Sequence, residues 1–295
     1  MAVDLHPDMP RRMFFRYPGS KRILARWILQ HVPADHDSFN DVYGGSGTVS
    51  WSKVRSSMER YNDLNGELLN MLRVLRERKE ELIAAIEQTY WAEAEMHLAL
   101  EPCGEPLERA RRFYARLWMA RYPFVPRPTF RRQIVLSRGR NGASQPMTPA
   151  AKLFMNTAHL HWYARRLRGV VLEQMDALAF VSYYDNERAV FYVDPPYPKG
   201  TRARKNGLYF ADSMTPKDHA KLAKTLRKAK GMVLVSGYAR NDDGSPNVLY
   251  TELYEDYEWQ RVERVTRIEG GRRKSEALWL SPRTVEALAA EKVIG

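Results

Sequence analysis

The feature that most constrains the fold is an apolar run that ends in an acid, two prolines and a tyrosine. The run covers residues 189–193 (AVFYV), and Asp194-Pro195-Pro196-Tyr197 follows it directly. A short, continuous apolar run is typical of a strand buried in a parallel sheet. At the carboxyl end of such a strand, where open α/β sheets bind ligands, this turn presents a carboxylate, backbone carbonyls and an aromatic ring. The combination suits a flat ring with an amino group: the aromatic stacks on the ring, and Asp194 and a carbonyl accept the amino hydrogens.

Strand and helix patterns alternate on both sides of a central segment that lacks them. The pattern predicts strands at 38–43, 58–62, 170–173, 189–193 and 231–236. It predicts helices from about Thr48, over 68–86 as one long helix, and over 215–230, with an antiparallel hairpin formed by 258–268 and 276–280. The proline-dense run 122–130 cannot be a continuous helix. We therefore predict one doubly wound α/β domain, residues 1–90 and 168–295, interrupted by an inserted, mostly helical subdomain at residues 91–167.

The positive charge of the chain is concentrated in this central segment. The formal net charge is +12, and residues 101–170 contain 14 Lys and Arg but only three Glu and no Asp. The other 225 residues contain 33 basic and 32 acidic side chains, so they are almost neutral. A concentrated basic block indicates a surface that binds a polyanion such as nucleic acid. The alternative is a solvated basic surface without a ligand.

Cysteine content and hydropathy indicate the compartment. Cys103 is the only cysteine, which excludes an intrachain disulfide and a thiolate metal cluster. No apolar run approaches the ~20 residues that span a bilayer. The first residues lack the basic start and apolar block of a secretory signal. We expect a cytoplasmic protein that is not bound to a membrane.

A glycine-rich turn predicts a cofactor site. Asp41-Val-Tyr43-Gly44-Gly45-Ser-Gly47 lies between an expected strand and helix, where glycines allow a ligand to approach the backbone. Asp63 ends the next strand, a position that accepts hydrogen bonds from ribose hydroxyls. The two together indicate a nucleoside cofactor. The chain has no G-x-x-x-x-G-K-[ST] sequence, so a P-loop nucleotide hydrolase is not expected.

The order of motifs resembles one enzyme family. The segments "RYPGSKR", "FNDVYGGSGTVSW", "YNDLNGELLNML", a basic insertion, "VVLEQMDAL" and "VFYVDPPY" are similar to the Dam-like DNA adenine-N6 methyltransferases over residues 14–285. The resemblance implies a Rossmann-like methyltransferase fold with S-adenosylmethionine (AdoMet) as methyl donor. It also implies that the basic insertion is the target-recognition region and that double-stranded DNA is the partner.

The resemblance assigns cofactor-binding roles residue by residue. The residues that match the family's donor-binding motifs are Tyr17, Lys21, Asp41, Tyr43, Gly44, Gly45, Gly47, Asp63 and Asp176. Within them, Asp63 matches the ribose-binding acid and Asp176 matches an acid that meets the donor's adenine amino group. Lys21 is also expected to approach the target base. Pro18 and Ser20 depart from the family's small-Gly-Gly-Lys turn.

The catalytic roles follow from the same resemblance. The exocyclic nitrogen of adenine is a poor nucleophile because its lone pair is delocalised into the ring. In the family, the residues matching the Asp194 carboxylate and Pro195 carbonyl accept the amino hydrogens, Pro196 completes the motif, and Tyr197 stacks on the base. No metal is required. In duplex DNA the target base must first be flipped out of the stack.

The DNA contacts are expected on arginines and lysines of two segments. The candidates are Arg131, Arg132, Arg138 and Arg140 in the insertion and Lys199, Arg202 and Arg204 after the catalytic motif. The sequence leaves other acceptors open, namely cytosine N4, adenine in RNA or a protein amide, and also a catalytically silent DNA-binding protein. It equally leaves open whether the enzyme acts alone, in a bacterial or phage-infected cell, or with a separate restriction endonuclease.

Overall fold

The chain folds into two compact units. The computed structural model describes residues 3–132, 136–138, 144–146, 150–197, 214–241, 244–267 and 273–294. The first unit consists of Met1–Met9, Ser20–Leu64 and Gly169–Gly295, and the second of Pro10–Gly19 and Asn65–Arg168. The second unit thus includes the helices that begin at Gly66, ahead of residue 91, where the insertion was expected to begin.

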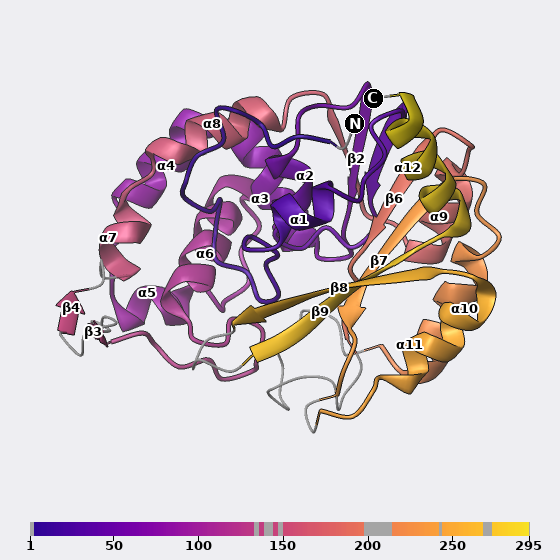
Figure 1. The fold of residues 1–295 in the computed structure, drawn as a ribbon. Helices are drawn as coiled ribbons and strands as arrows, with labels where there is room; N and C mark the ends of the chain where they lie inside the picture. Colours follow the sequence, from indigo (N-terminus) through magenta and orange to yellow (C-terminus); the bar gives the residue numbers. More distant parts are fainter. Residues whose placement is uncertain are drawn as a thin grey trace. The chain divides into compact units, whose positions relative to one another are not determined.

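The first unit is built on a seven-stranded sheet with the order β5-β2-β1-β6-β7-β9-β8 (Figure 1). Neighbours from β5 to β7 pair in parallel, whereas β9 is antiparallel to both β7 and β8. The strands are β1 (Ser38–Asp41), β2 (Met58–Asn62), β5 (Val170–Glu173), β6 (Ala189–Val193), β7 (Met232–Tyr238), β8 (Gln260–Arg267) and β9 (Arg273–Leu280). The predicted alternation and the C-terminal hairpin are therefore confirmed.

Helices cover both faces of this sheet. Phe191 of β6 faces a core formed with α9, α10 and α11, while Val190 and Tyr192 face a second core formed with α1, α2 and α12. Figure 1 shows α10 and α11 together along one side of the strands. The helices are α1 (Ala25–Leu29), α2 (Thr48–Ser52), α9 (Ala177–Tyr184), α10 (Pro216–Leu226), α11 (Val248–Leu253) and α12 (Pro282–Ile294), with a 3-10 turn, η1 (Glu255–Tyr257). Because β6 is buried on both faces, it lacks the polar alternation of a surface strand.

The second unit is mostly helical. Its elements are α3 (Gly66–Glu77), α4 (Lys79–Glu87), α5 (Glu93–Leu98), α6 (Pro106–Met119), α7 (Ala150–Met155), α8 (Ala158–Arg166) and a two-stranded ladder of β3 (Leu136–Arg138) and β4 (Ser144–Pro146). Helix α6 packs against α3, α4, α5 and α7 and buries Phe113, Tyr114, Leu117 and Trp118. The amphipathic α6 is therefore the central element of this unit.

The predicted single helix over 68–86 is wrong, because the chain leaves the helical conformation at Arg78. This residue has φ −129° and ψ 41°, and it separates α3 from α4. Its guanidinium donates hydrogen bonds to Glu81 and Glu105, which hold the break in place. The apolar positions on both sides of the break are buried, so the hydrophobic period continues across it and conceals it in the sequence.

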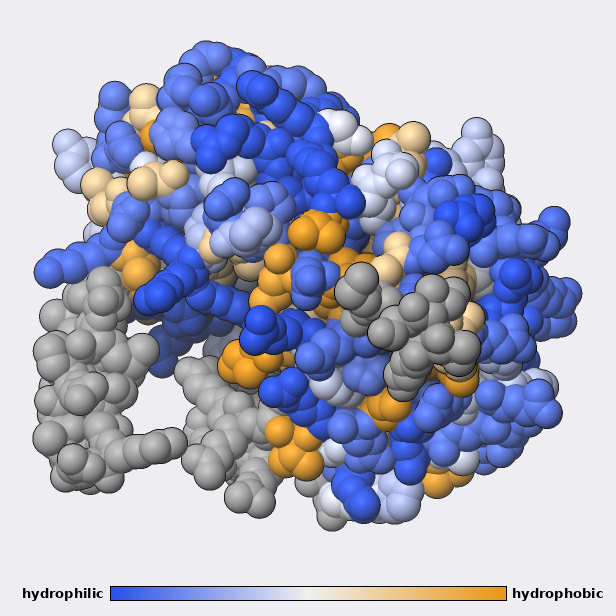
Figure 2. All heavy atoms as spheres, turned by 45° about the horizontal axis from the view of Figure 1, so that its top comes forward, coloured by the Kyte–Doolittle hydropathy of each residue, from blue (hydrophilic) through white to orange (hydrophobic). Residues whose placement is uncertain are grey.

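One face of the molecule illustrates the character of its surface. The face shown in Figure 2 is mostly hydrophilic, with hydrophobic side chains in small separate patches. Among the described residues, no helix combines the length and the apolar character needed to cross a membrane.

Candidate active site

Two of the predicted motifs lie side by side at the carboxyl edge of the sheet. Strands β1 and β6 are parallel neighbours, with Asp41 paired to Tyr192, and the amide of Val42 continues the ladder by donating to the Tyr192 carbonyl. From β1 the sheet extends in one direction to β2 and β5 and in the other to β6 and β7. The glycine turn after β1 and the Asp194 turn after β6 therefore meet at the switch point, where α/β sheets bind ligands.

The glycine turn requires a positive φ at one glycine and a close approach of a neighbouring ring at another. Gly47 has φ +59°, and a Cβ added at Gly44 would lie 2.2 Å from the ring of Tyr61. The amide of Gly45 donates to Asp63 Oδ2 at 2.8 Å, and the Tyr61 hydroxyl donates to the Gly45 carbonyl at 2.6 Å. Asp63, the predicted ribose acceptor, thus also holds the turn through one of its oxygens.

Asn62 joins the ends of three neighbouring strands. Its Nδ2 donates to the carbonyls of Val42 and Met175, both at 3.0 Å, and its Oδ1 accepts from the Met175 amide at 2.8 Å. The side chain is buried. Sequence reasoning placed Asn62 in the strand but missed this role; the signal is an amide side chain at the last position of a buried strand.

Asp41 is a buried carboxyl group with an unused acceptor. Its Oδ2 accepts a hydrogen bond from Ser50 Oγ at 2.5 Å, while Oδ1 is buried and has no partner among the described residues. Burial raises the pKa of Asp41 well above its usual range, and the charges of Asp194 and Asp63 raise it further, against the effect of the Ser50 hydrogen bond. The edge therefore gathers three acidic groups around the glycine turn.

Lys21 places a buried ammonium group within reach of the acid that follows β6. Its Nζ donates to the Tyr197 hydroxyl at 2.7 Å and lies 3.1 Å from Asp194 Oδ1 and 3.9 Å from Glu276 Oε2. Burial alone would lower the pKa of Lys21, but Asp194 and Glu276 outweigh it and raise that pKa well above its ordinary value. Lys21 is therefore charged at neutral pH.

Tyr197 completes this cluster with its hydroxyl as well as its ring. The hydroxyl donates to Asp194 Oδ1 at 2.8 Å while accepting from Lys21, and the ring packs edge-on against Tyr238 with centroids 4.6 Å apart. Burial raises the pKa of Tyr197, so the hydroxyl keeps its proton. Pro195 and Pro196 lie between Asp194 and Tyr197 and contribute no N–H donors of their own to the turn.

The sequence prediction missed Glu276. This residue lies on β9 directly opposite Tyr238 of β7 and is 8% exposed. Its strand alternates between the two cores: Ala277 and Trp279 face one, Leu278 and Leu280 the other. Because side chains alternate along a strand, Glu276 lies on the same side as Leu278, two positions later. An acid at such an inward-facing position is the signal that the sequence contains.

The remaining predicted cofactor residues have varied surroundings. Tyr43 packs against the core beside α9, α10 and α11, and burial raises its pKa. Asp176 is exposed and accepts hydrogen bonds from the amides of Leu178 and Ala179, so one of its oxygens caps α9. Tyr17 belongs to the other unit, in which its ring packs edge-on against Phe15 and Phe124. The cofactor roles of these three residues remain predictions.

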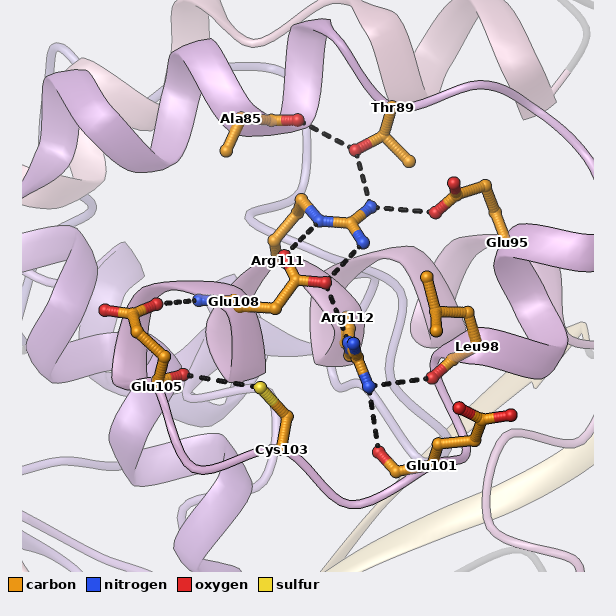
Figure 3. Close-up of polar contacts among 10 residues, drawn as sticks. All are labelled: Ala85, Thr89, Glu95, Leu98, Glu101, Cys103, Glu105, Glu108, Arg111 and Arg112. Carbon is orange, nitrogen blue, oxygen red and sulfur yellow. Dashed lines mark hydrogen bonds and ion pairs between the residues drawn. The ribbon is translucent and has the colours of Figure 1, made fainter.

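Many arginines of the basic segment are held by the protein itself. Figure 3 shows Arg111 and Arg112 of α6 both donating to Glu108, with Arg111 also bonded to Glu95 and Thr89. Arg112 further donates to the carbonyls of Leu98 and Glu101. These contacts arrange the helices of the second unit.

Two of the predicted DNA-binding residues are engaged in the same way. Arg131 Nε donates to the Ala120 carbonyl at 3.1 Å, and Arg132 pairs with Glu93. The structure gives no side-chain description for Arg138, and Arg140, Lys199, Arg202 and Arg204 lie outside the described residues. Several other basic side chains of the second unit are exposed and have no side-chain partner in the described part of the chain, among them Arg121, Arg127, Lys152 and Arg168.

In the described part of the chain, no group of three or more His, Cys, Asp or Glu side chains is arranged to hold a metal ion.

The sheet order, with its antiparallel last strand, and the glycine turn beside Asp194-Pro-Pro-Tyr197 define a Rossmann-like methyltransferase.

The chain belongs to the D12 class N6 adenine-specific DNA methyltransferase family, whose sequence model matches residues 17–268. The resemblance to Dam-like methyltransferases is thereby confirmed, and the protein is an enzyme of adenine-N6 DNA methylation. This selects adenine in DNA among the acceptors that the sequence left open. No curated protein shows significant similarity to the chain.

Proposed function

We propose that the protein transfers a methyl group from AdoMet to N6 of an adenine flipped out of duplex DNA, with Asp194 as the acceptor of the amino hydrogens. The observation that supports this is the position of Asp194 at the switch point, bonded to Tyr197 and Lys21 and beside the glycine turn. The cytoplasm of a bacterial or phage-infected cell is the proposed location, since the DNA lies there.

The residues of the glycine turn suit a cationic nucleoside donor. Asp41 has a buried oxygen without a partner among the described residues, and Asp63 and Asp194 lie near enough to affect its pKa. AdoMet carries an ammonium and a sulfonium, so an acid-lined cradle with glycines at its closest approach fits it. We assign Asp41, Gly45 and Asp63 to holding the donor, together with Tyr43, Gly44 and Gly47. When bound, the donor supplies a methyl carbon on a positively charged sulfur, which keeps the electron pair of the broken bond.

The chain's own residues act on the adenine. By accepting hydrogens from N6, the Asp194 carboxylate and the Pro195 carbonyl localise the nitrogen lone pair for bond formation. N6 forms one new bond to carbon and loses one proton, which Asp194 accepts. Stacking of the flipped base on an aromatic ring, assigned here to Tyr197, contributes ~1–3 kcal/mol and helps offset the few kcal/mol needed for flipping.

We further propose that the exposed basic side chains of the second unit contact DNA phosphates. Arg121 and Arg127 belong to the loop that the Ala120–Phe130 bridge closes, and Lys152 and Arg168 lie on and after the helices that follow. Unlike Arg131 and Arg132, these four side chains need break no described contact to bind a phosphate. Such contacts supply affinity and orientation without reading sequence.

The deciding experiment supplies methyl-labelled AdoMet and unmethylated duplex DNA to the purified protein and identifies the labelled nucleoside after digestion. We expect label in N6-methyladenine from the wild type and none from Asp194→Ala. Label in N4-methylcytosine would overturn the proposed base. DNA binding without any label would overturn the proposed catalysis.

A further inference from the structure

The Lys21 ammonium lies close to two carboxylates, one of which the proposed function needs for itself. Asp194 Oδ1 already accepts from Tyr197 at 2.8 Å and lies 3.1 Å from Lys21 Nζ. An ammonium at this distance competes with N6 for the carboxylate oxygens, which makes Asp194 a poorer hydrogen-bond acceptor for the N6 hydrogens. Lys21 in this position therefore opposes the chemistry.

The second carboxylate offers Lys21 another partner at almost the same place. Glu276 Oε2 lies 3.9 Å from Lys21 Nζ, and charged N–H···O bonds are ~2.8 Å long, so a shift of about 1 Å would join them. Glu276 is held at this position by its register opposite Tyr238, and both carboxylate and ammonium are almost fully buried. A buried charge that loses its partner is costly, so Lys21 can leave Asp194 only toward another anion.

We propose that Glu276 is a positioning residue that draws Lys21 away from Asp194 when the target adenine enters. Asp194 then presents its full charge to N6, while Lys21 stays neutralised by Glu276. The inference rests on the proposed function, and it concerns a residue that contacts the reaction only through Lys21.

The other groups around Lys21 cannot replace Glu276. Tyr192 and Tyr197 from β6 and its turn, Tyr238 from β7 and Tyr250 from α11 also face the ammonium. Burial raises the pKa of Tyr192, Tyr197 and Tyr250, so these three hydroxyls carry no charge near neutral pH. Among the groups that face Lys21, the carboxylates of Asp194 and Glu276 are therefore the ones that balance the positive charge of its ammonium.

The test is Glu276→Gln in the full chain, with Glu263→Gln as the matched control. Glu263 is an exposed carboxylate on the neighbouring strand, opposite Ala277. We expect Glu276→Gln to lower kcat about 10- to 100-fold, the effect of losing a charge-assisted contact, with KM for AdoMet and DNA within about twofold. Glu276→Asp should restore part of kcat, and Glu263→Gln should match the wild type.

Two readouts separate positioning from a merely structural role. Loss of Glu276 removes one of the charges that raise the Lys21 pKa, so Lys21 should lose its proton at lower pH in Glu276→Gln, and kcat of this variant should then recover as pH rises. In a Lys21→Met background, Glu276→Gln should cause no further loss of kcat.

Equal losses from Glu276→Gln in both backgrounds, or a wild-type kcat in Glu276→Gln at every pH, would overturn the inference. Failure of this inference can be told apart from failure of the proposed function. If only the role of Glu276 is wrong, the wild type still forms N6-methyladenine; if the proposed function is wrong, it does not.

Discussion

At the residue scale, burial of the Asp41 carboxyl group does not favour folding. A carboxyl at 1% exposure with one oxygen bonded to Ser50 and the other without a described partner loses hydration that the protein does not replace. Its folded pKa lies above its ordinary value of 3.8. Between these two pKa values the folded state binds the proton more strongly than the unfolded chain, so this group's contribution to stability falls as pH rises.

The substitution Asp41→Asn should therefore stabilise the free protein and weaken donor binding. Asn keeps an acceptor for Ser50 and carries no charge. We expect the Tm of the variant to exceed that of the wild type at pH 8, with a smaller difference at pH 4. AdoMet affinity, measured by calorimetry, should fall about 10-fold, because a charged acceptor is lost. An unchanged affinity would remove Asp41 from the donor site.

Tyr197 gives a second test, because its ring and hydroxyl have separable roles. Tyr197→Phe keeps the ring that packs on Tyr238 but removes the hydroxyl between Lys21 and Asp194. We expect a loss of kcat of about 3- to 10-fold for Phe, the value of one hydrogen bond, and about 10- to 100-fold more for Ala, which also loses stacking. Single-turnover methylation measures both. Equal losses in Phe and Ala would show that the ring contributes little.

The sequence predicted the parts of this site that are contiguous in the chain. A buried strand followed by Asp194-Pro-Pro-Tyr197 and a glycine turn followed by Asp63 are local patterns with fixed places at a sheet edge. Glu276 and Asn62 could not be assigned in this way. Glu276 reaches Lys21 through the pairing of β7 with β9, and Asn62 reaches Met175 across the sheet. Such contacts depend on register, which a single sequence does not specify.

At the scale of elements, strands were predicted more closely than helices. The bounds of β2, β5 and β6 coincide with the predicted runs because each is a short run bounded on both sides by polar or turn residues. The break between α3 and α4 escaped prediction because one non-helical residue, Arg78, leaves the apolar face continuous. At this break, the Arg78 guanidinium donates hydrogen bonds to two acids, one of them on the loop before α6.

At the scale of elements, helix α6 gives a testable prediction about stability and pH. Glu108 in its first turn accepts from Arg111 and Arg112, and these hydrogen bonds lower the pKa of Glu108 from 4.5 to about 2 (Figure 3). The stabilisation is therefore complete above pH 4.5 and is lost as pH falls toward 2. Glu108→Gln should cost about 1 kcal/mol at pH 7, allowing for partial exposure, and the difference from the wild type should vanish near pH 2.

Chemical denaturation at a series of pH values measures this difference. Glu101→Gln is the control, since the Glu101 carboxylate makes none of the contacts drawn in Figure 3. A constant difference between Glu108→Gln and the wild type over this range would mean that the carboxylate's charge is not what stabilises α6.

For the whole molecule, net charge overstates the charge free to bind DNA. The segment 101–170 has a large basic excess, but acids outside it neutralise part of that excess: Glu67 pairs with Arg109, Glu95 with Arg111, and Glu93 with Arg132. A count of charges along the sequence cannot show this, because each pair joins separate elements of the second unit. Salt dependence of binding, which counts phosphate contacts, measures the charge that remains.

Arg127→Ala and Arg112→Ala should therefore separate binding from folding. Arg127 is exposed and has no described side-chain partner, whereas Arg112 is bonded to Glu108 and to two carbonyls. We expect Arg127→Ala to weaken binding to all DNA sequences, to reduce the slope of log K against log salt by about 1, and to leave Tm unchanged. Arg112→Ala should lower Tm and leave the slope unchanged. The reverse pattern, a smaller slope for Arg112→Ala only, would place the DNA against α6 and not against the loop that carries Arg127.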